Sequence, residues 1–132
     1  ERIHGRRSVP LVSRAGAPLP LHATGVGKVL LAHAPREVVE ACLAGLAPAT
    51  RYTITERGRM LRELSTVRRT GYARTMEEMS LGTCSVAVPV MDADQQVVAA
   101  LGLVTSTVRR DLAKYVPALQ VAAASITRRM NP

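Results

Sequence analysis

The stretch SVAVPVMDADQQVVAALGLVT, residues 85–105, decides the fold class of this chain. Two apolar runs, Ser85–Met91 and Val97–Thr105, flank a short polar segment, Asp92–Gln96. Each run has the length of a strand, and two such runs around a polar turn are typical of an antiparallel β-hairpin. The sequence therefore predicts a hairpin in the second half of the chain.

Segments with helical periodicity surround this hairpin, and two shorter runs have the composition of strands. We expect Thr55 to cap the third helix and Gly71 to end it in the left-handed conformation. Helices interspersed with strands, one pair of them antiparallel, indicate an α+β domain with a mostly antiparallel sheet. The expected helices are Ala23–His33, Pro35–Leu43, Glu56–Thr70 and Asp111–Met130, the last with a kink at Pro117, and the further strands are Ser8–Ser13 and Tyr72–Thr75.

The spacing of apolar side chains predicts which face of each helix is buried. The opposite face of the third helix is rich in arginine, and we expect it to be solvated. The predicted buried residues are Val26, Val29, Leu30 and His33 in the first helix, Val38, Val39, Cys42 and Leu43 in the second, and Leu61, Leu64 and Val67 in the third.

Length and composition fit a single domain over residues 1–132. The chain is 47% hydrophobic, so it can bury a core and is not expected to be disordered. Its net charge of +8 raises the question of a nucleic-acid partner. The arginines are spread over the whole chain, however, and no recognisable nucleic-acid-binding signature accompanies them. Solvated helix faces are therefore a better interpretation than direct nucleic-acid contact by this domain.

Cysteine usage and hydropathy indicate the cellular setting. The two cysteines, Cys42 and Cys84, do not make a disulfide framework, which favours a reducing, cytoplasmic compartment. We expect no membrane span, because the sequence lacks an apolar run of about 18 residues. The chain opens on ERIHGRRSVPLVSR without an initiator methionine, so we expect it to be a fragment of a longer protein.

A glycine-containing turn opens the first expected helix, in HATGVGKVLLA, residues 22–32. A Walker-type phosphate loop would need a glycine in place of His22 and a hydroxyl in place of Val29, and a dinucleotide loop would need a glycine in place of Leu30. Two interpretations stay open. The unpaired N–H groups at the start of the helix favour an anion such as a carboxylate. Alternatively, the two glycines only allow the helix to pack closely on a sheet.

A second polar segment, MEEMSLGTCS, residues 76–85, directly precedes a core strand. Gly82 frees the backbone there, and the three residues after it can offer hydroxyl, thiol and amide groups to a ligand above the sheet. The alternative is a surface loop whose two glutamates, Glu77 and Glu78, are solvated. The sequence alone does not decide between these interpretations.

Catalysis requires a nucleophile that lies beside a base. Cys84 could pair with His22 or His33, but nothing in the spacing supports such a pairing. The histidines and cysteines also lack the short spacing that is typical of metal ligands. We therefore expect no enzyme activity, no metal site and no cofactor.

Two motifs carry a family resemblance when they are taken together. They are PLPLHATGVGKVLLAHAP, residues 18–35, and GYARTMEEMSLGTCSVAVPVMDADQQVVAALGLV, residues 71–104. In order, spacing and residue type the sequence resembles the C-terminal effector-binding domain of IclR-type bacterial transcriptional regulators. The similarity extends from about Leu19 to the C-terminus.

This resemblance implies a GAF-like or profilin-like fold, a curved antiparallel sheet flanked by helices. It also implies that the domain binds a small metabolite, often an organic acid, and so alters DNA binding by an N-terminal winged helix-turn-helix domain. We expect that DNA-binding domain, and the start of the effector domain, to be missing from this chain. Family members are usually dimers or tetramers, so the resemblance implies self-association as well.

The resemblance further implies a ligand pocket between the glycine-containing turn and the loop before the hairpin. Many relatives have an acidic pair where Thr75 and Met76 stand. Its absence makes the pocket less hostile to anions, and Met76 and Met79 make it more apolar, so we expect an aromatic acid in preference to the smallest oxoacids. The pocket positions carried over are Thr24, Gly25, Val26, Gly82, Thr83, Ser85 and Thr75, with apolar walls from Leu11 and Leu19.

Three other functional classes remain open. The domain could be an interaction module that only holds a regulator together, in which case the pocket would be filled. An enzyme based on Cys84 would require an unusually reactive thiol. Direct DNA binding through arginines of the third helix, such as Arg57 and Arg62, would make binding by this domain alone dependent on salt.

Overall fold

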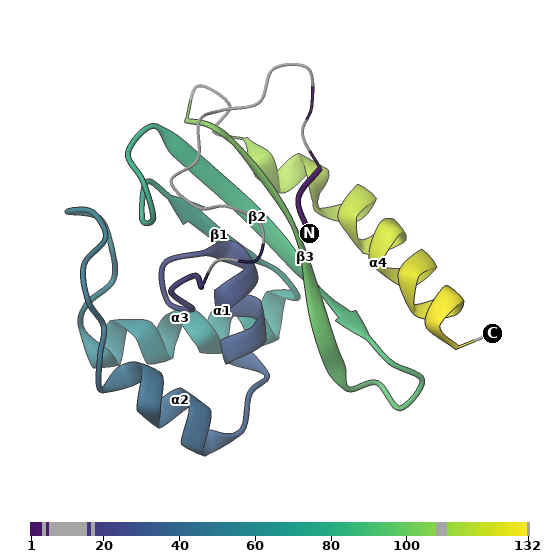
Figure 1. Ribbon diagram of the computed structural model, residues 1–132, viewed down its shortest axis with the longest axis horizontal. Helices are drawn as coiled ribbons and strands as arrows, with labels where there is room; N and C mark the ends of the chain where they lie inside the picture. The colour runs from purple at the N-terminus through teal and green to yellow at the C-terminus, as the bar shows by residue number, and fades with distance from the viewer. Residues whose placement is uncertain (4, 6–15, 17, 108–110, 132) are drawn as a thin grey trace.

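A sheet in the middle of the molecule organises the fold (Figure 1). The computed structural model describes residues 1–3, 5, 16, 18–107 and 111–131, and within them three strands pair antiparallel in the order β1-β2-β3. The predicted strand Ser8–Ser13 lies outside the described residues. The elements are α1 Gly25–Ala32, α2 Arg36–Leu43, α3 Arg57–Thr70, β1 Ala73–Met76, β2 Thr83–Met91, β3 Val97–Ser106, the 3-10 helix η1 Leu112–Tyr115 and α4 Val116–Met130.

The predicted hairpin is confirmed as β2 and β3. Val86 pairs with Leu103 and Ala87 with Gly102, so both runs keep one register over most of their length. In the turn, the Asp92 carboxylate accepts hydrogen bonds from the backbone N–H groups of Asp94 and Gln96, both at 2.9 Å. A polar residue that satisfies neighbouring N–H groups is what such a turn requires.

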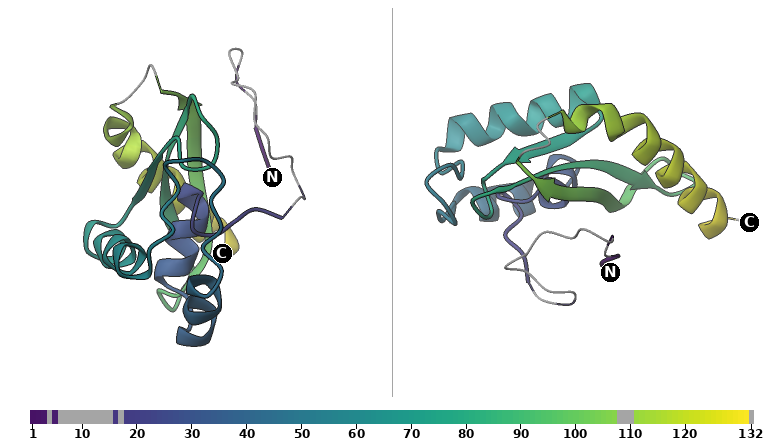
Figure 2. Two further views of the ribbon diagram at one scale, coloured as in Figure 1. Left: turned by 90° about the vertical axis from the view of Figure 1, so that its left-hand side faces the viewer. Right: turned by 90° about the horizontal axis from the view of Figure 1, so that it is seen from above.

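Alternation along β2 sends its side chains to two different layers. Ser85 and Ala87 face α1, while Cys84, Val86 and Val88 pack with α4 on the other face. Figure 2 shows α1 and α4 on opposite sides of the sheet. Both faces of β2 are buried along most of the strand, which explains why its sequence is apolar almost throughout.

Two apolar clusters fill the spaces beside the sheet. The first joins α1 to α3 and to the sheet, and the second joins the sheet to η1 and α4. Since the two clusters share β2, its packing links both layers. Members of the first cluster are Val29, Leu31, Ala32, Leu43, Ile54, Met60, Leu64, Val67, Ala73 and Ala87, and those of the second are Cys84, Val86, Val88, Val90, Leu112, Val116 and Ala123.

The start of α3 differs from the prediction, whereas its end does not. Thr55 was expected to cap this helix, but the cap is Glu56, whose carboxylate accepts hydrogen bonds at 2.7 Å from the backbone N–H groups of Gly58 and Arg59. These donors hold the pKa of the Glu56 carboxyl below its usual value. Gly71 ends the helix with φ +82°, the left-handed conformation that was predicted.

The predicted buried faces were only partly right. Leu30, Val38 and Leu61 are exposed, and His33 lies exposed at the C-cap of α1. The residues actually buried at the neighbouring positions include Leu31 and Met60. In α1 the buried face is wider than predicted and includes Leu31, because this helix packs against β2, β3 and α3 at once. Val29, Leu43, Leu64 and Val67 are buried as expected.

The last predicted helix is divided in two. A 3-10 turn, η1, precedes α4, and Pro117 occupies the first turn of α4 rather than a kink within a longer helix. Proline suits this place because the first N–H groups of a helix have no intrahelical acceptor. The hydroxyl of Thr127 donates to Met91 O at 2.7 Å, which fixes α4 on β2.

Candidate functional site

The N-terminus of α1 lies directly on β2. Thr24 caps the helix, since its hydroxyl accepts the N–H of Gly27 at 3.1 Å and donates to Pro20 O at 3.0 Å. A Cβ at Gly25 would lie 2.8 Å from Ser85 Oγ, closer than real Cβ atoms come. Gly25 is therefore required for the close approach of this helix to the strand, so the packing interpretation of the glycine is supported.

Gly27 also has a packing reason. A Cβ there would overlap the backbone carbonyl of Leu21 and the hydroxyl of Thr24, within the turn that leads into α1. Further along the same surface, a Cβ at Gly102 would lie 2.9 Å from a methyl group of Val26. The helix start is thus pressed against both β2 and β3.

Two hydroxyl groups are buried beneath the helix start. Thr75 Oγ1 and Ser85 Oγ lie 2.6 Å apart and form a hydrogen bond, because β1 and β2 pair these two residues directly. Both residues are less than a tenth exposed. The predicted site residues Gly25, Thr75 and Ser85 are therefore brought together by the fold.

The first N–H groups of α1 are not used by the described parts of the chain. Gly27 and Lys28 donate to the Thr24 hydroxyl and carbonyl, but no described acceptor takes the N–H of Gly25 or Val26. Such groups at a helix start carry a partial positive charge and favour an anion. The geometry is thus compatible with a carboxylate at this end of α1 as well as with tight packing.

The loop residues of the predicted site lie at the entrance to β2. Gly82 has φ +80°, and its N–H donates to the Glu77 carboxylate at 2.8 Å. Thr83 is half-buried and hydrogen-bonds to Ser80. This loop is therefore ordered by its own side chains, and the idea that its glutamates are merely solvated was wrong.

The two apolar walls are less well defined. Leu19 is partly exposed in the segment before α1, and no described contact brings it to Ser85. Leu11 lies outside the described residues. These two positions stay predictions.

Lys28 is a feature of the site that was missed at the sequence level. It is fully buried, and its ammonium lies 2.8 Å from Glu78 Oε1, 3.0 Å from Glu63 Oε1 and 3.2 Å from Arg74 O. A buried lysine in an ion pair is unusual, because the charge loses its hydration. The available signal in the sequence was the pair Gly27-Lys28, which does not fit a phosphate loop. Its lysine lies one turn after the start of α1, close to the predicted site.

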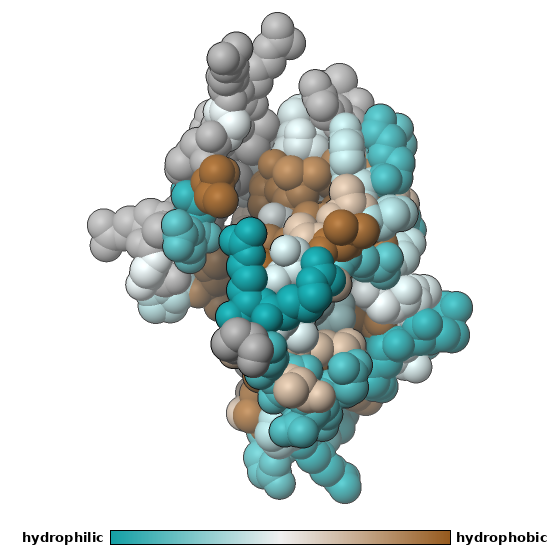
Figure 3. Space-filling view, turned by 90° about the vertical axis from the view of Figure 1, so that its right-hand side faces the viewer, coloured by the Kyte–Doolittle hydropathy of each residue, from teal (hydrophilic) through white to brown (hydrophobic). Residues whose placement is uncertain are grey.

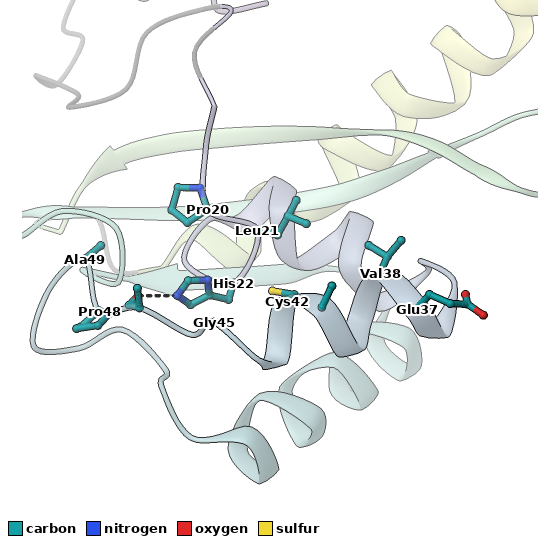
Figure 4. A pocket seen from close by; sticks show the side chains of 11 residues that line it. Pro20, Leu21, His22, Glu37, Val38, Cys42, Gly45, Pro48 and Ala49 are labelled. Carbon is teal, nitrogen blue, oxygen red and sulfur yellow. Dashed lines mark hydrogen bonds between the residues drawn. The ribbon is translucent and has the colours of Figure 1, made fainter.

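An open hollow lies elsewhere on the described part of the molecule, between α2 and the segment before α1 (Figure 4). It has a volume of about 750 Å³. Leu21, Val38 and Cys42 contribute to its mainly apolar lining, and the ring of His22 at its edge donates from Nε2 to Ala47 O at 2.8 Å. With that nitrogen occupied, the hollow offers few polar groups to orient a ligand. It does not coincide with the predicted site.

The proposed partners for catalysis are not brought together. Cys84 faces the α4 layer, whereas His22 and His33 lie before and after α1 on the other side of the sheet. Burial, followed by the charge of Glu77, raises the pKa of the Cys84 thiol, which disfavours the thiolate. Within the described ranges no group of three potential metal ligands occurs, and no helix is long and apolar enough to cross a membrane.

The fold and the site define the class of this chain: an α+β domain in which a helix start lies over a buried hydroxyl pair on an antiparallel sheet. Residues 1–128 match the family model for the C-terminal region of the bacterial transcriptional regulator IclR. The chain therefore belongs to the IclR family of transcriptional regulators. This confirms the family resemblance and the predicted α+β fold.

Individual relatives agree with this assignment. The chain is 37% identical to the HTH-type transcriptional regulator XynR of Escherichia coli (strain K12), over 99% of this chain and 54% of XynR. The inducer-binding domain of PobR from Acinetobacter, a double mutant solved with 3-hydroxybenzoic acid, has a TM-score of 0.83 and 36% identity over 93% of this chain and 74% of that chain. An IclR homologue from Microbacterium hydrocarbonoxydans, solved with 4-hydroxybenzoate, has a TM-score of 0.86 and 30% identity over 93% of this chain and 51% of that chain.

The chain spans about half the length of the first curated relatives that it matches. These relatives are named as transcriptional regulators and not as enzymes.

Proposed function

We propose that this chain is the sensing domain of an IclR-type regulator and that it binds a small organic acid at the start of α1. The observation that carries the proposal is a pair of N–H groups, those of Gly25 and Val26, that no described acceptor takes. They belong to a helix start that packs on Ser85, whose hydroxyl is hydrogen-bonded to Thr75. In this arrangement the N–H groups bind the carboxylate. The hydroxyl pair and the entrance of β2 at Thr83 border the rest of the ligand.

An aromatic acid suits this site better than a two- or three-carbon oxoacid. Thr75 contributes a neutral hydroxyl at a position where an acidic side chain would repel an anion. Apolar surface is also available beside the helix start, because Val26 packs on β3 and Val104 of that strand is partly exposed. Two structures similar to this one contain 3-hydroxybenzoic acid and 4-hydroxybenzoate, which supports the same class of ligand.

The regulatory output follows from the same proposal. Ligand binding changes DNA binding by an N-terminal helix-turn-helix domain, in keeping with the names of the relatives. The ligand must favour one of two states of the full regulator for this to occur. The present domain contributes sensing and self-association, and it performs no chemical reaction.

Self-association without a ligand is the second candidate function. Figure 3 shows apolar surface among hydrophilic side chains on the side of the molecule turned toward α4 and β3. Exposed apolar patches often mark interfaces between protein chains. Five large apolar side chains of β3 and α4 are exposed. They are Val98 and Val104 on β3 and Val121, Ile126 and Met130 on α4.

A thermal-shift panel with matched variants tests the proposal. The panel contains benzoate, 3- and 4-hydroxybenzoate, pyruvate and glyoxylate. A ligand present at about 100 times its dissociation constant stabilises the folded state by roughly 2.7 kcal/mol, which is readily measured. We expect a hydroxybenzoate to stabilise the chain, and Ser85→Leu to abolish the shift.

Ser65→Leu, on the exposed surface of α3, is the control and should respond like the unmodified chain. If only the short oxoacids bind, the aromatic preference is wrong. A silent panel for a chain that is a stable dimer in solution would favour the assembly function.

A further inference from the structure

The buried ammonium of Lys28 joins three segments that are distant in sequence. It lies against the carboxylates of Glu63 on α3 and Glu78 in the loop after β1, and against the carbonyl of Arg74 on β1. Lys28 itself follows Gly25 by three residues and therefore lies one turn further along α1. One ammonium thus links the helix that carries the proposed ligand site to α3, to β1 and to the loop after β1.

The loop carboxylate depends on that cation. Glu78 Oε1 is buried and has no hydrogen-bond partner of acceptable geometry among the described residues, and its 2.8 Å contact with Lys28 is an ion pair. Its other oxygen, Oε2, accepts the backbone N–H of Met76 at 3.2 Å. A buried carboxylate without a compensating charge is strongly unfavourable, so the position of the loop follows the position of the ammonium.

The side chains of Lys28 and Glu78 also cover the outer edge of β1. Arg74 and Met76 are two residues apart, so their backbone groups point to the same side of the strand, away from β2. Lys28 covers the carbonyl of Arg74, and Glu78 covers the N–H of Met76. Between these two residues lies Thr75, whose hydroxyl bonds to Ser85 beneath Gly25.

We propose that Lys28 is a positioning residue for effector binding. Through Glu78 and Arg74 it holds the edge of β1 and the loop 77–82 against α1, and so fixes the spacing between the helix N–H groups and the Thr75–Ser85 hydroxyls. The proposal rests on the proposed function, since it concerns the same ligand site. Lys28 does not contact the ligand; it acts through the backbone of β1 and through the loop.

The test uses variants that remove the tie without leaving a buried charge. The triple variant Lys28→Met/Glu63→Gln/Glu78→Gln replaces each charged group by a neutral one of similar size. Glu78→Gln alone weakens the tie to the loop and keeps Lys28 paired with Glu63, which protects the test if the triple variant does not fold. Lys114→Met is the matched control, because Lys114 is the second of the two lysines and its ion pair with Asp111 is exposed.

Two quantities are measured in each variant that is folded by circular dichroism: hydrogen exchange of the amides of residues 77–83, and the Kd for 4-hydroxybenzoate by calorimetry. We expect faster exchange of these amides in both test variants, and a Kd raised by about tenfold in the triple variant, a usual size for coupling between two parts of a protein. Lys114→Met should change neither quantity. A structural role alone would lower stability but leave the Kd of the folded protein unchanged.

The outcomes separate this inference from the proposed function. If the unmodified chain binds 4-hydroxybenzoate and the folded variants bind it equally well, the positioning role is overturned and the ligand site stands. If exchange of the loop amides is unchanged, the tie itself is overturned without reference to any ligand. If the unmodified chain binds none of the acids in the panel, the proposed function fails and the positioning role fails with it.

Discussion

The two faces of the sheet are built differently. The α4 face is held mainly by apolar side chains such as Val86, Val88 and Leu112. The α1 side has an apolar cluster too, but the buried polar and charged residues of the described chain gather there and around the loops beside it. They are His22, Lys28, Thr53, Thr75 and Ser85.

This difference separates a supporting face from a face that can bind a ligand. Buried polar groups cost free energy unless they are paired, so their concentration on one side calls for an explanation beyond stability. Thr75, Ser85 and Lys28 meet around the start of α1, where the proposed ligand site lies. Changes on the α4 face should therefore alter stability alone, whereas changes on the α1 face should alter stability and binding together.

The largest effect is expected for Lys28→Met. Removal of the ammonium leaves the carboxylates of Glu63 and Glu78 without their partner, and breaking a buried ion pair in this way costs about 3–5 kcal/mol. Denaturant unfolding measures the change in free energy. Val121→Ala on the exposed surface of α4 should change it by less than about 0.5 kcal/mol. Similar losses in both variants would mean that the buried ion pair of Lys28 does not stabilise the α1 face.

A smaller effect is expected for Val88→Ala on the α4 face. Val88 is fully buried, and the loss of two methyl groups together with the cavity left behind costs about 2 kcal/mol. The Kd for 4-hydroxybenzoate, measured below the unfolding transition, should stay the same. A clear change in that Kd would show that the α4 face takes part in binding.

Gly25→Ala sharpens the comparison at the contact itself. The new methyl group would lie 2.8 Å from Ser85 Oγ, and overpacking of this kind typically costs about 1–3 kcal/mol. Ser85→Ala removes the hydroxyl that clashes, so the double variant should lose less than the sum of the two single variants. Additive losses in a double-mutant cycle would mean that the helix start does not press on Ser85.

The smallest effect is expected away from both faces, at the exposed N-cap of α3. The backbone N–H groups of Arg59 and Gly58 lower the pKa of Glu56 from its ordinary value of 4.5. A lowered folded-state pKa means that the carboxylate stabilises the protein above this value, and that the contribution disappears as the pH falls through the folded pKa. In Glu56→Gln, stability should fall less steeply as the pH is lowered. Thermal unfolding measured between about pH 6 and pH 3 checks this expectation. If stability depends on pH in the same way in Glu56→Gln and in the unmodified chain, the Glu56 cap does not contribute to the acid sensitivity.

Local features of the fold could be predicted from the sequence. The hairpin of β2 and β3 and the left-handed Gly71 depend on residues close together in the chain, and both are confirmed. The start of α3 was displaced by one residue, because Thr55 and Glu56 can both cap a helix and the sequence does not rank them.

The environment of Lys28 could not be predicted in the same way. A lysine on a short helix is normally solvated. Its partners Glu63 and Arg74 lie 35 and 46 residues away, so the burial follows from tertiary packing alone. The family motifs placed Gly25, Thr75 and Ser85 in one site, and the fold brings these residues close to one another. Local periodicity alone gave no indication of this proximity.

The most direct test of the central claim is a titration of the isotope-labelled chain with 4-hydroxybenzoate, followed by the backbone amide NMR signals. If the carboxylate binds at the start of α1, the signals of Gly25 and Val26 should show the largest shifts and saturate with a single Kd. Thr75→Val and Ser85→Ala should raise that Kd. Shifts that cluster instead around Leu21 and Cys42, at the hollow beside α2, or no shifts at all, would contradict the account.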